Sequence, residues 1–140
     1  MTTLAYKDGI VAYDGLSTAG DMIVSHNHDK KVVINSIVFV YAGTVCEKDS
    51  LISAYLMGEK EVDAKVEMFV INSGEISVVS TDEGKIWEDK LELTECYALG
   101  SGREYAMAAM DAGLSAKEAV KIASKRDLFT GGKIRTVRVK

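Results

Sequence analysis

The sequence predicts one domain of the α+β class, spanning residues 1–140, in which helices cover antiparallel sheets. Short runs of β-branched and aromatic residues follow one another through dipeptides that suit tight turns, and connections this short join antiparallel strands. Other segments carry apolar residues three and four positions apart, which is the spacing of a helix with one apolar face. Such a face has to be buried, so we expect the helices to pack on the sheets.

Strand pairs are predicted in the first part of the chain. Residues 2–7 and 10–13 flank Asp8-Gly9, a dipeptide that tolerates the positive φ angles of a two-residue hairpin turn. Residues 31–42 are rich in valine, isoleucine and aromatic side chains, and Asn35-Ser36 divides them into two strands. The apolar composition of these two strands predicts that they are buried.

Further strands are predicted in the middle and at the end. Residues 66–71 and 76–80 form a strand pair around a turn at residues 72–74, and residues 134–139 form a last strand. Connections of this length again favour antiparallel pairing over a doubly wound parallel sheet.

Three helices are predicted. Residues 47–57 carry apolar side chains at spacings of three and four. Residues 103–112 form a second helix that ends at Gly113, a residue suited to the left-handed cap. The third helix begins at Ser115, whose hydroxyl forms a capping box with Glu118, and it continues to about residue 125.

Composition excludes several classes of protein. With 47% hydrophobic residues the chain is not a disordered tail, and with a net charge of −4 it is a poor match for nucleic-acid phosphates. The longest apolar run, near residues 37–42, is far shorter than the roughly 20 residues that cross a bilayer, so no membrane association is expected. Lys7 and Asp8 interrupt any signal-peptide core, which predicts a cytoplasmic protein.

No metal or cofactor is predicted. His26 and His28 stand beside Asp29, but the chain has no third histidine, which favours a pair of exposed loop histidines. Gly100-Ser101-Gly102 has Tyr105 where a dinucleotide fingerprint needs its third glycine. The two cysteines lack metal-ligand spacing and are expected to be reduced packing residues.

The start of the chain carries the most chemical information. A small residue after Met1 favours removal of Met1 by methionine aminopeptidase, which would leave Thr2 with a hydroxyl and a free α-amine. Such an amine has a pKa of about 7.7 to 8.0, close enough to neutrality to act as a base for the adjacent hydroxyl. One residue can therefore supply both nucleophile and base.

Four separated segments resemble one family together, in the order in which that family has them. They are Thr2-Thr3-Leu4-Ala5 with Gly9-Ile10-Val11-Ala12 and Asp14-Gly15; Lys30-Lys31-Val32 with Ala42-Gly43; Ala98-Leu99-Gly100-Ser101-Gly102 with Tyr105-Ala106; and Asp127-Leu128-Phe129-Thr130-Gly131-Gly132. With these segments the chain resembles the proteasome β subunits and the bacterial peptidase HslV, which are N-terminal-nucleophile hydrolases.

The resemblance implies a fold and partners. The fold would be a four-layer αββα sandwich, in a shortened member of the family with one helix between Gly43 and Ser101 where two are usual. The implied partners are further copies of the chain in a ring, a peptide or unfolded-protein substrate, and an ATPase unfoldase. Nucleic acid and membranes are not among them.

The resemblance also implies catalytic roles. Thr2 Oγ would attack a peptide carbonyl, Lys31 would lower the pKa of that hydroxyl, and Asp14 would hold the lysine charged. The Gly43 N–H would stabilise the oxyanion. Hydroxyl and carboxylate groups would surround the amine, from Ser101, Asp127 and Thr130. The substrate groove, with an apolar first pocket that favours hydrophobic side chains, would be lined by Thr18, Val33, Tyr41 and Val45.

Structural explanations exist for the same residues. Asp14-Gly15 also suits a turn, Lys31 a solvated strand end, and Ser101 a helix cap. The leading interpretation is a threonine peptidase that cleaves peptide bonds through Thr2. Two alternatives stay open, namely a catalytically silent structural subunit that retains Met1 and an amidase that acts on a small molecule.

Overall fold

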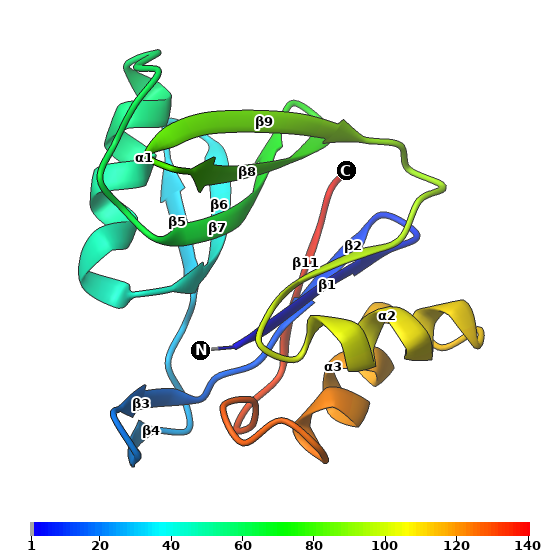
Figure 1. The fold of residues 1–140 in the computed structure, drawn as a ribbon. Helices are drawn as coiled ribbons and strands as arrows, with labels where there is room; N and C mark the ends of the chain where they lie inside the picture. Colours follow the sequence, from blue (N-terminus) through cyan, green and yellow to red (C-terminus); the bar gives the residue numbers. More distant parts are fainter. Residues whose placement is uncertain (1) are drawn as a thin grey trace.

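The computed structural model describes residues 2–140, and within them the chain forms three antiparallel sheets (Figure 1). The first sheet has the strand order β10-β1-β2-β11 and contains the first and last strands of the described chain. Its strands are β1 (Thr3–Lys7), β2 (Ile10–Tyr13), β10 (Tyr97–Gly100) and β11 (Arg135–Arg138).

The second large sheet is a five-stranded meander in which each strand pairs with the next along the chain. It contains β5 (Lys31–Ile34), β6 (Ile37–Gly43), β7 (Val66–Asn72), β8 (Glu75–Asp82) and β9 (Lys85–Leu91). A separate two-stranded hairpin is formed by β3 (Ser17–Ala19) and β4 (Met22–Ser25).

The predicted two-residue hairpin turns are confirmed. Asp8 and Gly9 have φ angles of 52° and 75°, and Asn35 and Ser36 have φ angles of 53° and 67°. Two successive positive φ angles match the right-handed twist of the flanking strands, which fixes the register of β1 with β2 and of β5 with β6.

The three predicted helices are also confirmed, with ends close to the expected ones. They are α1 (Lys48–Leu56), which follows a short 3-10 turn η1 (Val45–Glu47), α2 (Arg103–Asp111) and α3 (Ala116–Ser124). The capping box between Ser115 and Glu118 is present, and Gly113 has the positive φ of 100° that suits the end of α2.

None of the helices in the described chain has the length and apolar character needed to cross a membrane.

The side chains of β1 alternate between the two faces of the four-stranded sheet. Leu4 and Tyr6 belong to the core between the two large sheets, where they meet Phe69 of β7. Ala5 faces the other way, into a second cluster formed with alanines of α2 and α3. Alanine side chains are small, so these helices lie close against the four-stranded sheet (Figure 1).

The expectation of a four-layer αββα sandwich is wrong. Within residues 2–140 most regular structure lies in the three antiparallel sheets, and each of the three helices is nine residues long. The chain between α1 and α2 forms β7 to β10, which leaves no segment for a second helix beside α1. Helix α1 alone packs on the outer face of the five-stranded sheet, around a core of Phe39, Leu51 and Met68.

Four strands were not predicted from the sequence. Strands β3 and β4 are three and four residues long, and β9 is a largely exposed edge strand with a charged sequence. Strand β10 ends at Gly100 in a glycine-rich segment, a composition that is typical of loops. Each one is specified by pairing with a neighbouring strand rather than by its own composition.

Candidate active site

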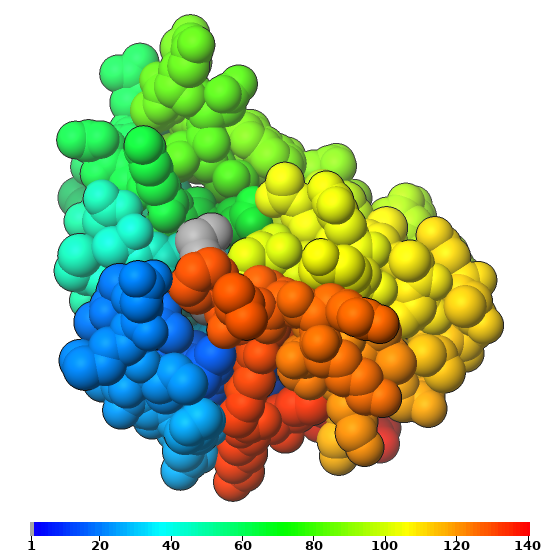
Figure 2. Space-filling view, turned by 60° about the horizontal axis from the view of Figure 1, so that its bottom comes forward, coloured from blue at the N-terminus to red at the C-terminus, as the bar shows by residue number. Residues whose placement is uncertain are grey.

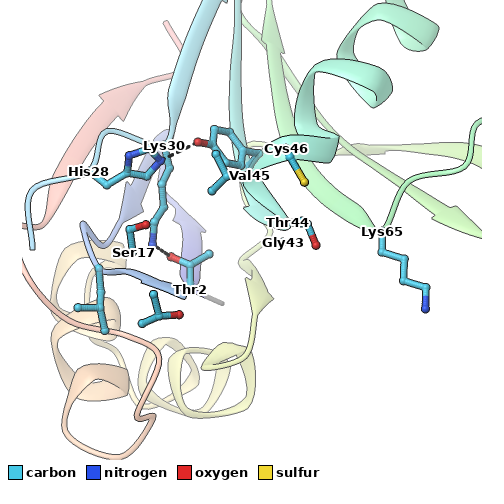
Figure 3. A pocket seen from close by; sticks show the side chains of 12 residues that line it. Thr2, Ser17, His28, Lys30, Gly43, Thr44, Val45, Cys46 and Lys65 are labelled. Atoms are coloured by element: carbon cyan, nitrogen blue, oxygen red, sulfur yellow. Dashed lines mark hydrogen bonds between the residues drawn. The ribbon is translucent and has the colours of Figure 1, made fainter. Parts of the chain in front are cut away.

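Three polar side chains meet where the four-stranded sheet approaches the start of β5. Thr2 is 1% exposed, Asp14 is 0% exposed and Lys30 is 4% exposed. The Lys30 Nζ donates to Thr2 Oγ1 (Figure 3) and, at 2.8 Å, to Asp14 Oδ1. The Thr2 hydroxyl contacts the same carboxylate oxygen. A buried hydroxyl therefore touches both members of a buried ion pair.

Asp14 is fixed by backbone amides as well as by Lys30. Its carboxylate accepts hydrogen bonds from the Thr3 amide at 3.1 Å, the Leu16 amide at 3.3 Å and the Gly131 amide at 3.0 Å. These donors belong to segments near both ends of the chain, which lie side by side in Figure 2, where residues near 130 adjoin the β3–β4 hairpin. The carboxylate can stay buried because every one of these bonds compensates its lost hydration.

The lysine of this cluster is Lys30, and the expectation that Lys31 lies beside Thr2 is wrong. Consecutive side chains in an extended strand point to opposite faces. Lys31 pairs with Val40 of β6, a residue of the core between the sheets, whereas the Lys30 side chain reaches Thr2. Lys31 is also partly exposed. The sequence contains two adjacent lysines, and only the register of β5 determines which of them reaches Thr2.

Burial lowers the pKa of the Lys30 ammonium, and the charge and hydrogen bond of Asp14 oppose that effect. The ammonium is thus less strongly basic than a free lysine, yet it remains paired with a carboxylate at 2.8 Å. Such a group can stabilise negative charge that develops on the Thr2 hydroxyl.

A second cluster lies on the opposite side of β1. Asp127 Oδ2 accepts hydrogen bonds from Ser101 Oγ at 2.5 Å and from Thr130 Oγ1 at 2.6 Å. The Thr130 hydroxyl also contacts the Thr3 hydroxyl at 2.7 Å, and Ser101 Oγ donates to the Thr2 carbonyl at 3.3 Å. The three predicted residues are thus brought together, and they bond to the backbone and neighbour of Thr2.

Two glycines permit this close approach of the β10–α2 connection to the start of β1. A side chain on Gly100 would overlap the Thr2 carbonyl, and one on Gly102 would overlap the Thr3 hydroxyl. Gly100 also has a φ of +93°, which disfavours other residues. Any larger residue at either place would push Thr2 or Thr3 out of position.

Thr2 and Lys30 lie at the wall of a cavity of about 700 Å³. Gly43 lines the same cavity with a φ of +128°, and a Cβ there would meet the Lys65 carbonyl oxygen at 2.6 Å. Three of the four residues expected in a substrate groove line the cavity, namely Thr18, Tyr41 and Val45. Val33 does not, because it alternates with Val32 along β5 and is 56% exposed.

His28 also lines this cavity, although the sequence favoured an exposed loop histidine. Its Nε2 lies 2.8 Å from the Tyr41 hydroxyl. His28 and Lys30 are two positions apart just before β5, and both line the cavity. That spacing was the available signal, and it becomes informative only once Lys30 is known to point into the site.

Met1 lies outside the described residues, so its predicted removal stays a prediction. Within residues 2–140, no group of three or more His, Cys, Asp and Glu side chains is placed to hold a metal ion.

The whole chain has the fold of a bacterial protein of known structure, Thiobacillus denitrificans BPH. The match has a TM-score of 0.71 at 18% sequence identity and covers 99% of this chain and 98% of that chain. A second structure of that protein, in complex with epoxomicin, matches with a TM-score of 0.71 at 19% identity and the same coverage. No protein-family model matches the chain, and neither does any curated protein sequence.

Proposed function

We propose that this protein is a threonine peptidase of the N-terminal-nucleophile type, similar to proteasome β subunits, with Thr2 as its nucleophile once Met1 is removed. The observation that carries the proposal is the contact of the buried Thr2 hydroxyl with the Lys30 ammonium and the Asp14 carboxylate at a cavity wall. A threonine with a merely structural role needs neither a buried cation nor a large open cavity beside its hydroxyl.

The reaction follows from these positions. Thr2 Oγ attacks the carbonyl carbon of a peptide bond, and the α-amine of Thr2 accepts the hydroxyl proton. Lys30, held by Asp14, stabilises the developing negative charge on Oγ. The C–N bond then breaks, the amine passes the proton to the leaving nitrogen, and an ester between Thr2 and the acyl group remains. Water hydrolyses this ester and restores the hydroxyl.

The surrounding groups have supporting roles in this proposal. The Gly43 N–H binds the oxyanion of the tetrahedral intermediate, and the glycine at this position allows the chain to turn along the cavity. Ser101, Asp127 and Thr130 fix the peptide unit of Thr2 and the side chain of Thr3. The nucleophile is thereby held in one orientation before substrate arrives.

The structure of Thiobacillus denitrificans BPH with epoxomicin supports the choice of reaction. Epoxomicin is a peptide epoxyketone that inhibits proteasomes. Its two electrophilic carbons suit a residue that offers a hydroxyl and a free amine together. In this chain Thr2 would be that residue, which makes a peptide the favoured substrate over a small-molecule amide.

The proposal predicts that processed protein, with Thr2 at its N-terminus, gains the mass of one epoxomicin molecule and hydrolyses fluorogenic peptides. Thr2→Ala removes the attacking oxygen, so it should abolish both the adduct and the turnover while leaving the fold intact. Intact-mass spectrometry, initial rates and circular dichroism measure these three properties. Protein from its natural source that retains Met1 and hydrolyses no peptide would instead identify a silent structural subunit.

The adjacent lysines provide a matched control. Lys30→Ala removes the cation beside Oγ and should lower kcat/KM by about 10²- to 10³-fold, as the loss of one group that stabilises transition-state charge does. Lys31→Ala removes a partly exposed charge on the other face of β5 and should leave kcat/KM within about twofold. Equal losses in the two variants would contradict the assignment of Lys30.

A further inference from the structure

One wall of the cavity beside Thr2 carries a polar contact that the catalytic mechanism does not use. His28 Nε2 lies 2.8 Å from the Tyr41 hydroxyl, and the two rings meet edge to face at a centroid distance of 6.3 Å. The backbone of His28 is anchored on both sides, because its amide donates to the Gly15 carbonyl at 2.9 Å and its carbonyl accepts from Arg135 at 3.3 Å. The His28–Tyr41 pair is therefore a fixed feature of the wall.

The cavity lining beside this pair has charges of one sign. Among the described residues that line the cavity, the ionisable side chains are cationic or neutral at pH 7, and none carries a carboxylate. Lys48 adds a further cation, with its Nζ 5.5 Å from the centre of the Tyr41 ring. A substrate group with negative charge or with hydrogen-bond acceptors therefore meets no opposing carboxylate in this lining.

The pair also lies where a substrate side chain would reach. Figure 3 shows Thr2 at the Nζ end of the Lys30 side chain and His28 near its backbone end, where His28 contacts Tyr41. A side chain next to a carbonyl at Thr2 would run along the aliphatic stem of Lys30 and past Val45 before its tip met the pair. Apolar walls with a polar end fit a side chain with an aliphatic stem and a polar tip.

We infer that His28 and Tyr41 determine specificity, by selecting substrates whose residue before the scissile bond is glutamine or glutamate, with glutamate increasingly favoured when His28 is protonated. This inference rests on the proposed peptidase function. It differs from the hydrophobic preference that the sequence led us to expect.

The preference for glutamine or glutamate follows from which member of the His28–Tyr41 pair donates the hydrogen bond between them. Burial raises the pKa of Tyr41 to about 12, so its hydroxyl keeps its proton. When His28 is neutral, the Tyr41 O–H can donate to the histidine, and its oxygen is then free to accept from an amide N–H. When His28 is protonated, its N–H must donate to Tyr41, and the Tyr41 O–H turns toward an acceptor on the substrate.

The charged groups that face His28 decide where this change occurs. Burial lowers the pKa of His28, the charges of Lys30, Lys48 and Arg135 lower it further, and Asp29 opposes them. Protonation is therefore complete only below the ordinary histidine pKa of about 6.5, whereas free glutamate stays ionised down to about pH 4.3. Below the lowered pKa of His28, and down to about pH 4.3, an imidazolium therefore meets a carboxylate.

The test uses three fluorogenic peptides that differ only in leucine, glutamine or glutamate before the scissile bond. We expect the ratio of kcat/KM for glutamate over leucine to rise about tenfold from about pH 8 to about pH 5, since one pKa unit of coupling corresponds to that factor. Using a ratio removes the pH dependence of the Thr2 chemistry, which the peptides share.

Variants test whether the selectivity depends on His28 and Tyr41 or on neighbouring residues. His28→Gln keeps hydrogen-bonding groups without a titration, so its glutamate-to-leucine ratio should not change with pH. Tyr41→Phe should lower the glutamine-to-leucine ratio about fivefold or more, because glutamine loses its hydrogen-bond partner. His26→Gln replaces an exposed histidine two positions away and should behave as the wild type. Turnover of the leucine peptide reports that each variant is folded.

Each outcome decides the inference. A glutamate-to-leucine ratio that is independent of pH in the wild type, or unchanged pH dependence in His28→Gln, would overturn it while turnover of the leucine peptide upholds the proposed function. Failure of the processed wild type to hydrolyse any of the peptides would overturn both.

Discussion

Asp127 shows how a single carboxylate is kept ionised near the candidate nucleophile. Its partial burial favours the neutral form, but hydrogen bonds from the Ser101 hydroxyl, the Thr130 hydroxyl and the Phe129 amide favour the charged form. The balance lowers the pKa of Asp127 below its ordinary value of 3.8. Ionised Asp127 therefore stabilises the folded state, because the unfolded chain offers no such donors.

We expect Asp127→Asn to lower the free energy of unfolding by about 1 to 2 kcal/mol at pH 7, since hydrogen bonds to a charged acceptor are lost. The difference from wild type should stay constant above the unfolded pKa of about 3.9 and shrink as pH falls through the lowered folded pKa. Urea denaturation at a series of pH values measures it.

Asp21→Asn is the control for that experiment. Asp21 is an exposed residue between β3 and β4, so its neutralisation should leave the stability profile unchanged across the same pH range. A difference between Asp127→Asn and wild type that grows toward acid would contradict the assignment.

Among the secondary-structure elements, the approach of α2 to β1 is the one that positions the site. The connection from β10 to α2 passes over Thr2, and the amide of Gly102 lies 3.4 Å from the Thr2 carbonyl oxygen. Gly102 has a φ of −94°, which any residue adopts, so space alone requires glycine there. A change at Gly102 therefore tests the distance between these elements without straining the backbone.

We predict that Gly102→Ala lowers stability by about 1 to 3 kcal/mol, because the added methyl group collides with the Thr3 hydroxyl. It should also lower kcat/KM by about 10²-fold, as expected when a catalytic group moves by about 1 Å. Chemical denaturation and initial rates provide the two measurements.

Gly113→Ala is the control that distinguishes a loss of stability from a loss of activity. Gly113 has a φ of +100° but open space around it, so alanine there strains the backbone at the end of α2, and we expect a cost of about 1 kcal/mol. Since α2 remains in contact with β1, kcat/KM should stay near wild type. Comparable losses of activity in both glycine variants would show that stability alone explains the effect of Gly102→Ala.

Across the whole molecule, polar contacts join the two large sheets near the site in addition to the apolar core, and a carboxylate of β7 makes one of them. Glu67 of β7 accepts the amide of Gly100, the last residue of β10, at 2.7 Å, and it lies 3.9 Å from Arg103 at the start of α2. Its side chain is 27% exposed. Glu67 therefore ties the sheet that carries Gly43 to the strand that ends beside Thr2.

Glu67→Ala leaves the buried Gly100 amide without this acceptor, and we expect it to lower the free energy of unfolding by about 1 to 3 kcal/mol. Glu67→Gln retains an acceptor oxygen and should recover much of that loss. Glu75→Ala removes only an exposed ion pair with Lys90 on the same sheet and should cause a much smaller change. Equal unfolding midpoints for Glu67→Ala and wild type would show that the bridge is unimportant.

Local sequence predicted those elements whose signals are local. The turns at Asp8-Gly9 and Asn35-Ser36 and the capping box at Ser115 depend on residues that are neighbours in the chain, and all three are present in the structure. Strands β3, β4, β9 and β10 were missed because their hydrogen bonds are made with other strands, and pairing rather than composition defines them.

The candidate site divides in the same way. Thr2, Asp14 and Gly43 were recognised from motifs, and the structure places all three at or beside the cavity. The choice between Lys30 and Lys31 and the position of Val33 depend on which face of β5 points inward, and a shift of one residue reverses that assignment.

The sequence by itself determined the tight turns, the order of most elements and the residue types available for the chemistry, since these follow from periodicity, turn residues and side-chain identity. Only the tertiary structure decided that three antiparallel sheets with three short helices replace the expected αββα sandwich, that Lys30 rather than its neighbour meets Thr2, and that His28 joins Tyr41 at the cavity. The reason is physical. Strand register and the packing of one sheet on another arise from contacts between residues far apart in the chain, and a local pattern does not contain them.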